Sequence, residues 1–161
     1  MSSPETPEIA VGQPAPEFNL EATGGRRVSL REFHGRQAVV LYFYPKDDTP
    51  GCTTEACAFR DLSGRFAEVA ATILGVSPDA VASHEEFAAK YTLPFPLLAD
   101  PDHAVATAYG VYGERTLYGK KSMGISRSTF VIDREGAVRK IYRRIKVEDH
   151  AEEVLAFLGT L

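Results

Sequence analysis

The sequence predicts an α/β fold in which a mixed central β-sheet is flanked by helices on both faces. Runs of β-branched and aromatic residues without polar interruption, at 38–44 and 71–77, are typical of strands buried on both faces. Segments of helical composition separate such runs, and this alternation implies parallel strands joined by crossover helices. Near the end of the chain, two strand-like runs are joined by Arg134-Glu135-Gly136, a hairpin signal that adds antiparallel pairing.

The remaining elements follow from local patterns. Two prolines in "GQPAPEFNL" at 12–20 predict an extended segment. Short strands are expected at 95–100, 128–133 and 137–143. Helical composition marks 53–69, 80–91, 102–110 and 148–161, the last with an apolar stripe of Val154, Leu155 and Leu158. At 161 residues, with no internal repeat or long linker, we expect a flexible tail at 1–8 and one domain at 9–161.

Composition narrows the possible functions and the compartment. The formal net charge of −4 gives no reason to expect nucleic acid as a partner. The first ten residues lack the basic and apolar regions of a secretory signal, and no apolar run approaches the roughly 20 residues that cross a bilayer. Two cysteines in a chain without a secretory signal favour a reducing compartment, so we expect a cytoplasmic protein that is not bound to membranes.

Both cysteines lie in one short segment, "YFYPKDDTPGCTTEAC", at 42–57. Thr49 is a favoured N-cap, and Pro50 suits the first helical position because its missing N–H costs nothing there. Gly51 and Cys52 then fall in the first turn, where backbone N–H groups have no intrahelical partner. These donors, together with the positive end of the helix dipole, favour a thiolate at Cys52.

The helix end alone is too weak to make a strongly acidic thiol. Lowering the pKa of a thiol from about 8.5 to about 6 takes roughly 3.4 kcal/mol, whereas a helix terminus supplies about 0.3–1 kcal/mol and up to about 2 when partly buried. A second positive group is required. Arg127 is the candidate because it lies just before a predicted strand, and strand ends near a topological switch share one crevice. A surface salt bridge is the alternative reading of Arg127.

The spacing of Cys52 and Cys57 restricts how they can react. On a helix, residues five apart have Cα atoms roughly 8.6 Å apart, and a disulfide tolerates at most about 7 Å. The two thiols can therefore bond only if the helix start unwinds. Two inert buried cysteines and a structural disulfide remain alternatives. A zinc site is disfavoured because the histidines show no ligand spacing and receive no role: His34, His84, His103 and His150.

With these residues assembled, the chain resembles a peroxiredoxin of the bacterioferritin-comigratory-protein, or PrxQ, subfamily. The peroxiredoxin signature P-x-x-x-T-x-x-C is met by Pro45, Thr49 and Cys52, and Cys57 stands at the second thiol of the subfamily. Arg127, within "MGISRSTFVID", matches the place of the family's active-site arginine. The order of elements, βαβ first and ββα last, is similar to that of the thioredoxin-like fold.

The resemblance implies a thiol peroxidase without metal or organic cofactor. Cys52 would be the peroxidatic thiol, and Gly51 and Cys52 N–H groups, Thr49 and Arg127 would bind the hydroperoxide, with Pro45 shielding the site. Cys57 would resolve the sulfenic acid into a Cys52–Cys57 disulfide, which thioredoxin or a glutaredoxin-like dithiol would reduce. A monomer is expected.

Two other functions stay open from the sequence. One is a thioredoxin-like binding or holdase module with incidental cysteines. The other is a general thiol–disulfide oxidoreductase, which is disfavoured because no C-x-x-C is present. The basic run at 139–146 is interpreted as a solvated strand face, with a docking patch for an acidic partner as its alternative.

Overall fold

The computed structural model describes residues 9–117 and 119–161, so the predicted tail at 1–8 lies outside the described residues. The strands are β1 (Asn19–Ala22), β2 (Arg26–Ser29), β3 (Ala38–Phe43), β4 (Ala71–Ser77), β5 (Leu97–Ala99), β6 (Tyr112–Leu117), β7 (Lys120–Ile125), β8 (Ser128–Ile132) and β9 (Val138–Arg143). The helices are the 3₁₀ turn η1 (Leu30–Phe33), α1 (Pro50–Asp61), α2 (Ser63–Glu68), α3 (Val81–Tyr91), α4 (Ala104–Ala108) and α5 (His150–Leu158).

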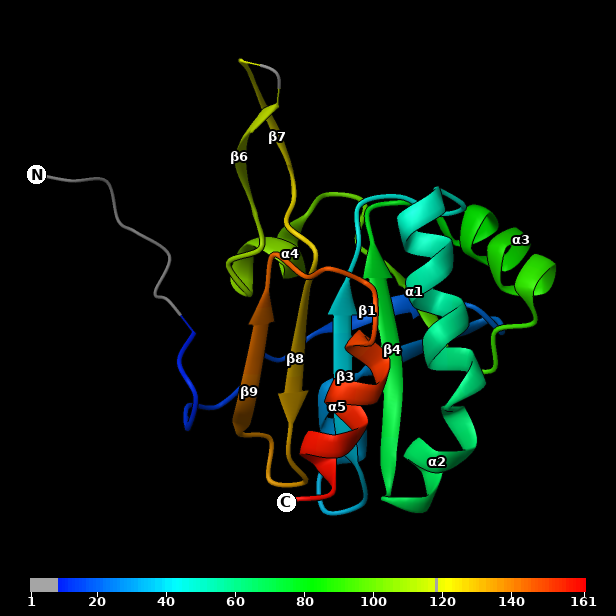
Figure 1. The fold of residues 1–161 in the computed structure, drawn as a ribbon, viewed down its shortest axis with the longest axis vertical. Helices are drawn as coiled ribbons and strands as arrows, with labels where there is room; N and C mark the ends of the chain where they lie inside the picture. The colour runs from blue at the N-terminus through cyan, green and yellow to red at the C-terminus, as the bar shows by residue number, and fades with distance from the viewer. Residues whose placement is uncertain (1–8, 118) are drawn as a thin grey trace, which may run out of the picture.

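The central sheet is mixed, as predicted. Its strand order is β2-β1-β5-β4-β3-β8-β9. Strands β3, β4 and β5 run parallel, whereas β8 pairs with β3 and β9 in antiparallel register. The carboxyl ends of β3 and β4 therefore lie at the same edge of the sheet as the start of β8, which Figure 1 shows at the top of the molecule.

Helices cover both faces of the sheet because β3 buries side chains on both sides. Val40 and Tyr42 point into one hydrophobic cluster together with residues of α1, α2 and α5. Leu41 and Phe43 point into a second cluster, which Ala106 of α4 joins. Figure 1 shows α1 and α5 in front of the sheet. In the part of the chain that the structure describes, no helix is both long and apolar enough to cross a membrane.

Most predicted elements are confirmed, with one correction. The helical stretch predicted at 53–69 is two helices, because α1 ends at Asp61 and Leu62 leaves helical geometry with φ −103° and ψ 4°. Its start at Pro50 agrees with the N-terminal signals in the sequence. The hairpin of β8 and β9 and the buried face of α5 also agree with the prediction.

Two hairpins were not predicted. Strands β1 and β2 are only four residues each, too short for a clear alternation. Among the described strands, β6 and β7 pair with each other and with no other strand, and they project from the body of the molecule (Figure 1). Four successive residues of β7, 120–123, are exposed, so this hairpin lacks the apolar face by which a strand is recognised in a sequence.

Candidate active site

The segment between β3 and α1 delivers Cys52 to the edge of the sheet. Thr49 has the extended conformation of an N-cap, with φ −91° and ψ 156°, and Pro50 begins α1. Cys52 lies in the first turn and is only 1% exposed. The Thr49 hydroxyl does not cap the helix, which corrects the sequence-based expectation. It instead donates a hydrogen bond to the Lys46 carbonyl oxygen at 2.9 Å.

Arg127 lies against Cys52. Its Nη2 donates to the Cys52 sulfur at 3.1 Å, and its Nη1 donates to Glu55 Oε1 at 2.7 Å. The strand register explains this approach, because Ser128, the next residue, pairs with Phe43 at the end of β3. A Cβ atom at Gly51 would lie 3.2 Å from Arg127 Nη2, so the glycine leaves the guanidinium the room it needs.

Glu55 is a buried carboxyl group with one satisfied oxygen. It is 1% exposed. Burial raises its pKa from 4.5 to about 7, although the positive charge and hydrogen bond of Arg127 act in the opposite direction. Among the described buried side chains, Glu55 Oε2 and Tyr42 Oη have no hydrogen-bond partner. Burial raises the pKa of Tyr42 well above its ordinary value, with Glu55 and Cys52 adding to the effect.

Cys57 lies further along the same helix. Both cysteines are free, Cys52 buried and Cys57 half-buried, and α1 is intact from Pro50 to Asp61. This agrees with the expectation that a helical segment keeps the two thiols unbonded. The positive charge of Arg60 lies near Cys57, and Asp61 and Cys57 both raise the pKa of that guanidinium.

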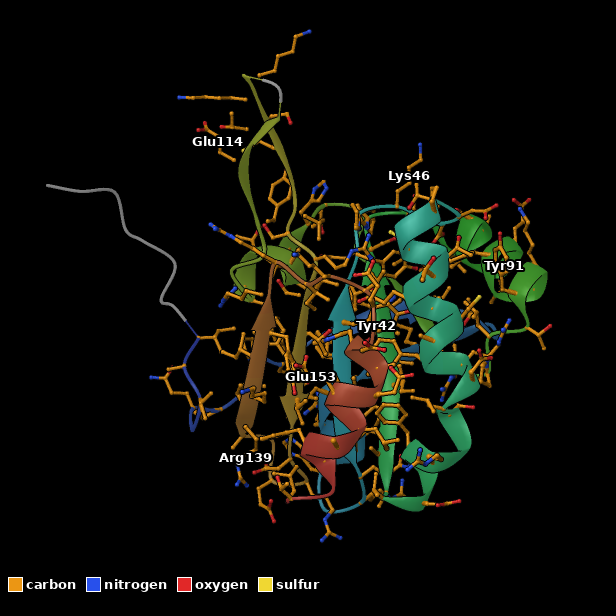
Figure 2. All side chains as sticks on the ribbon, in the orientation of Figure 1. Tyr42, Lys46, Tyr91, Glu114, Arg139 and Glu153 are labelled. Carbon is orange, nitrogen blue, oxygen red and sulfur yellow. The ribbon has the colours of Figure 1, made fainter. Side chains whose placement is uncertain are left out.

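The other predicted site residues lie on the same loop. Pro45 is half-buried and follows Tyr44 directly. Figure 2 shows Lys46 at the end of the molecule where α1 begins. Tyr42 lies in the hydrophobic cluster that β3 shares with α1 and α5. Pro45, Thr49, Gly51 and Cys52 therefore belong to one continuous segment, and Arg127 is brought to it from far along the chain.

Sequence reasoning missed three residues around this segment: Glu55, Asp47 and His84. The i, i+3 spacing of Cys52 and Glu55, which places both on one helix face, is a signal that could have identified Glu55. Asp47 and His84 are both buried and are in contact, with His84 Nδ1 2.7 Å from Asp47 Oδ2. Neither has a local signal, since the contact joins two elements far apart in the sequence.

Comparisons with known proteins agree with this geometry. The sequence model of the AhpC/TSA family matches residues 11–141. Peroxiredoxin Bcp of Bacillus subtilis is 50% identical over 150 residues, which cover 93% of this chain and 95% of that protein. The structure of Xanthomonas campestris peroxiredoxin Q is 46% identical and covers 89% of this chain and 90% of its own, with a TM-score of 0.85.

A further structure, of the bacterioferritin comigratory protein of Xanthomonas campestris, concerns alkyl peroxide reduction in a trapped intermediate/ligand complex. It is 45% identical, covers 89% of this chain and 90% of its own, and has a TM-score of 0.85. The likeness to these structures confirms the predicted thioredoxin-like fold. The chain thus belongs to the AhpC/TSA family and, within it, to the Bcp (PrxQ) peroxiredoxins, which are thiol peroxidases.

Proposed function

We propose that Cys52 is the peroxidatic thiol of this enzyme and that its substrates are hydrogen peroxide and organic hydroperoxides. The Cys52 thiolate attacks the terminal oxygen of the hydroperoxide, forming an S–O bond as the O–O bond breaks. The other oxygen leaves as hydroxide or alkoxide and takes a proton from solvent to give water or an alcohol, and Cys52 becomes a sulfenic acid. The alkyl peroxide activity addressed for the Xanthomonas campestris relative supports the organic substrates.

One observation carries this proposal: a buried thiol in the first turn of a helix, 3.1 Å from a guanidinium nitrogen. The free N–H groups of Gly51 and Cys52 and the Arg127 guanidinium stabilise the thiolate before attack and the charge on the departing oxygen during it. The hydrogen of the Thr49 hydroxyl is committed to the Lys46 carbonyl, so its lone pairs are left to accept a hydrogen bond from the peroxide. Pro45 shields the thiol from water.

Cys57 completes the cycle as the resolving thiol. Its sulfur attacks the sulfenic sulfur of Cys52 and releases water, which leaves an intramolecular Cys52–Cys57 disulfide. Because helix geometry keeps the two residues too far apart to bond, the first turns of α1 unwind before this step. An external dithiol, thioredoxin or a glutaredoxin-like protein, then reduces the disulfide. The enzyme acts as a monomer in the cytoplasm, with no metal or organic cofactor.

The test is a thiol titration before and after one equivalent of peroxide, on the parent protein and on Cys52→Ser and Cys57→Ser. The parent should lose two thiols. Cys52→Ser should consume no peroxide, because a hydroxyl cannot replace a thiolate. Cys57→Ser should consume the first equivalent and then stall, with Cys52 over-oxidising.

Residual turnover in Cys52→Ser would refute the role of Cys52. Normal steady-state turnover with thioredoxin in Cys57→Ser would refute the resolving role of Cys57 while leaving the first step standing. A reduced parent protein that consumes no peroxide would favour the binding-module alternative.

A further inference from the structure

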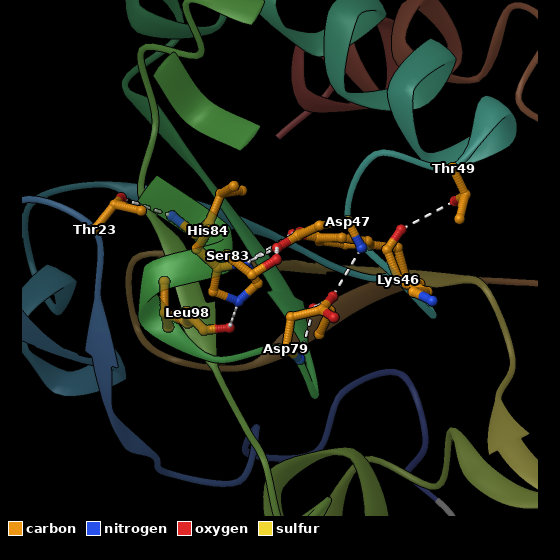
Figure 3. A network of polar contacts seen from close by, with 11 residues as sticks. Thr23, Lys46, Asp47, Thr49, Asp79, Ser83, His84 and Leu98 are labelled. Carbon is orange, nitrogen blue, oxygen red and sulfur yellow. Dashed lines mark hydrogen bonds and ion pairs between the residues drawn. The ribbon is translucent and has the colours of Figure 1, made fainter. Parts of the chain in front are cut away.

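A polar network lies beneath the loop that precedes Cys52, and Figure 3 shows Asp47 at its centre. Asp47 Oδ1 accepts a hydrogen bond from the Tyr44 hydroxyl at 2.6 Å. Its Oδ2 accepts from the Ser83 hydroxyl at 2.8 Å and faces His84 Nδ1 at 2.7 Å. The Asp47 backbone N–H donates to Asp79 Oδ2, also at 2.7 Å. Both the side chain and the backbone of Asp47 are thus fixed.

The partners of His84 determine where its protons are. His84 is fully buried, and its Nε2 lies 2.9 Å from the Leu98 carbonyl oxygen, which can only accept. Nε2 therefore carries a hydrogen, and a second proton lies between Nδ1 and Asp47. Burial raises the pKa of Asp47, but the hydrogen bonds from His84 and Tyr44 outweigh it and the pKa is lowered.

The cluster has the spacing of a metal site but not its chemistry. Ligand atoms of Asp47, Asp79 and His84 lie within 4.8 Å of one another. Both ring nitrogens of His84 and both carboxylate oxygens of Asp47 already have hydrogen-bond partners within the protein. A metal ion would have to displace these contacts, so we interpret the cluster as a support for the loop.

The network reaches Thr49 through the backbone. The Lys46 carbonyl and the Asp47 N–H belong to the same peptide unit. Its N–H donates to Asp79, and its carbonyl oxygen accepts the hydrogen bond of the Thr49 hydroxyl. On the other side, Asp48 has a left-handed φ of 58° and is held by the side chains of Lys90 and Tyr91, both at the end of α3. The peptide that orients the Thr49 hydroxyl is therefore fixed to α3 and to the segment after β4.

We propose that Asp47 and His84 are positioning residues for peroxide reduction, acting through the Lys46–Asp47 peptide on the Thr49 hydroxyl. The inference rests on the proposed function, in which Thr49 accepts a hydrogen bond from the peroxide. Without the pair, the Lys46 carbonyl moves and the lone pairs of Thr49 no longer face the substrate. The thiolate itself, held by Arg127 and the helix start, is left in place.

Comparing two reactions of Cys52 distinguishes a loss of Thr49 positioning from a general disordering of the active site. Peroxide attack requires an oriented Thr49 hydroxyl, whereas alkylation by iodoacetamide requires the thiolate but no hydrogen bond from the reagent to Thr49. Both rates should be measured on reduced parent protein and on Asp47→Ala, Asp47→Asn and the control Asp133→Ala, each in a Cys57→Ser background so that one thiol reacts. The Asp133 carboxylate, like that of Asp47, accepts several hydrogen bonds, here from two backbone N–H groups and Arg139, but it lies in the β8–β9 turn at the other end of the sheet.

We expect Asp47→Ala to slow peroxide attack about 10- to 100-fold, the usual loss for a misplaced substrate-orienting group, while alkylation changes less than about threefold. Asp47→Asn should recover most of the rate, because its amide can donate to His84 Nδ1 and accept from Tyr44. Asp133→Ala should match the parent. If Asp47→Ala does not fold, Ser83→Ala and Tyr44→Phe each remove one contact to Asp47 and should give smaller losses of the same selectivity.

The inference is overturned if Asp47→Ala attacks peroxide at the parent rate, if both reactions fall together, or if Asp47→Asn is as slow as Asp47→Ala. Equal rates for Ser83→Ala, Tyr44→Phe and the parent would overturn it as well. These results differ from failure of the proposed function, in which the parent protein itself consumes no peroxide.

Discussion

Two buried contacts between titratable side chains lie at the start of α1, and they differ in how many of their polar atoms have hydrogen-bond partners. Asp47 and His84, on its N-terminal side, have a partner for every side-chain nitrogen and oxygen. In the other contact, Glu55 lies on the helix itself and Arg127 just before β8, and Glu55 Oε2 is buried without a partner. A buried unsatisfied polar atom costs about 1–3 kcal/mol. The contact whose polar atoms all have hydrogen-bond partners, Asp47–His84, thus precedes the helix, and the contact that leaves one polar atom without a partner, Glu55–Arg127, involves the helix itself.

The difference matches what the two segments do in the proposed cycle. Residues up to Thr49 orient the substrate and should keep one conformation throughout. Residues from Pro50 to Cys57 must unwind before the disulfide forms, and segments that open are drawn from the less stable parts of a protein. Gly51, Thr53 and Thr54 are weak helix formers, which lowers the cost of opening further. Breaking the contact between Glu55 and Arg127 therefore costs less free energy than breaking the contact between Asp47 and His84.

The largest expected effect is on stability. Replacing His84 by Phe removes one hydrogen-bond partner from the Asp47 carboxylate and the partner of the Leu98 carbonyl, and a buried polar group that loses its partner costs about 1–3 kcal/mol. Arg127→Met should cost less, because Glu55, with a pKa of about 7, can take up a proton at neutral pH. Urea denaturation at pH 7 measures both. Equal losses in the two variants would contradict the contrast between the pairs.

The next effect is on the first chemical step. Arg127→Met removes the donor to the Cys52 sulfur and should slow peroxide attack about 100- to 1,000-fold, as loss of one charge-stabilising donor does in other enzymes. The thiolate of the variant should also form at higher pH. Arg127→Lys is the matched control: it keeps the charge but cannot reach Cys52 and Glu55 together, so an intermediate rate is expected. An unchanged pH–rate profile in Arg127→Met would mean that another cation stabilises the thiolate.

The parts of the site that sequence predicts are those set by local chemistry. Pro50 and Thr49 mark a helix start in any context, and an uninterrupted apolar run such as Ala38–Phe43 indicates a buried strand. From these two features the position of Cys52 follows. The role of Arg127 could also be predicted, because it immediately precedes a recognisable strand and because its segment resembles that of a known family.

The contacts that sequence did not predict depend on register and on packing between distant elements. Glu55 meets Arg127 only because β8 pairs antiparallel with β3 in one register. His84 was assigned no role, since nothing within α3 indicates that its ring lies against Asp47. The Thr49 hydroxyl was expected at the helix N–H groups, but the left-handed Asp48 turns the Lys46 carbonyl toward it. Each of these facts belongs to the assembled fold.

The smallest effect is a pH dependence of helix opening. When the first turns of α1 unwind, Glu55 enters water and its pKa falls from about 7 to an ordinary 4.5. The folded helix start therefore has its full stability below pH 4.5 and loses it progressively as pH rises through about 7. Opening should increase roughly tenfold or more between pH 5 and pH 8, since one pKa unit corresponds to a factor of ten.

Hydrogen exchange of the amides from Thr53 to Cys57, corrected for the intrinsic pH dependence of exchange, measures this opening directly. Glu55→Gln keeps the shape of the side chain and an oxygen for Arg127 but cannot ionise. Its corrected opening should therefore not change with pH between pH 5 and pH 8. Glu68→Gln, at an exposed glutamate of α2, is the control and should keep the slope of the parent. If the parent shows no slope, or if Glu55→Gln retains it, the opening of the helix start is not linked to Glu55. The contrast between the two contacts would then rest on hydrogen bonding alone.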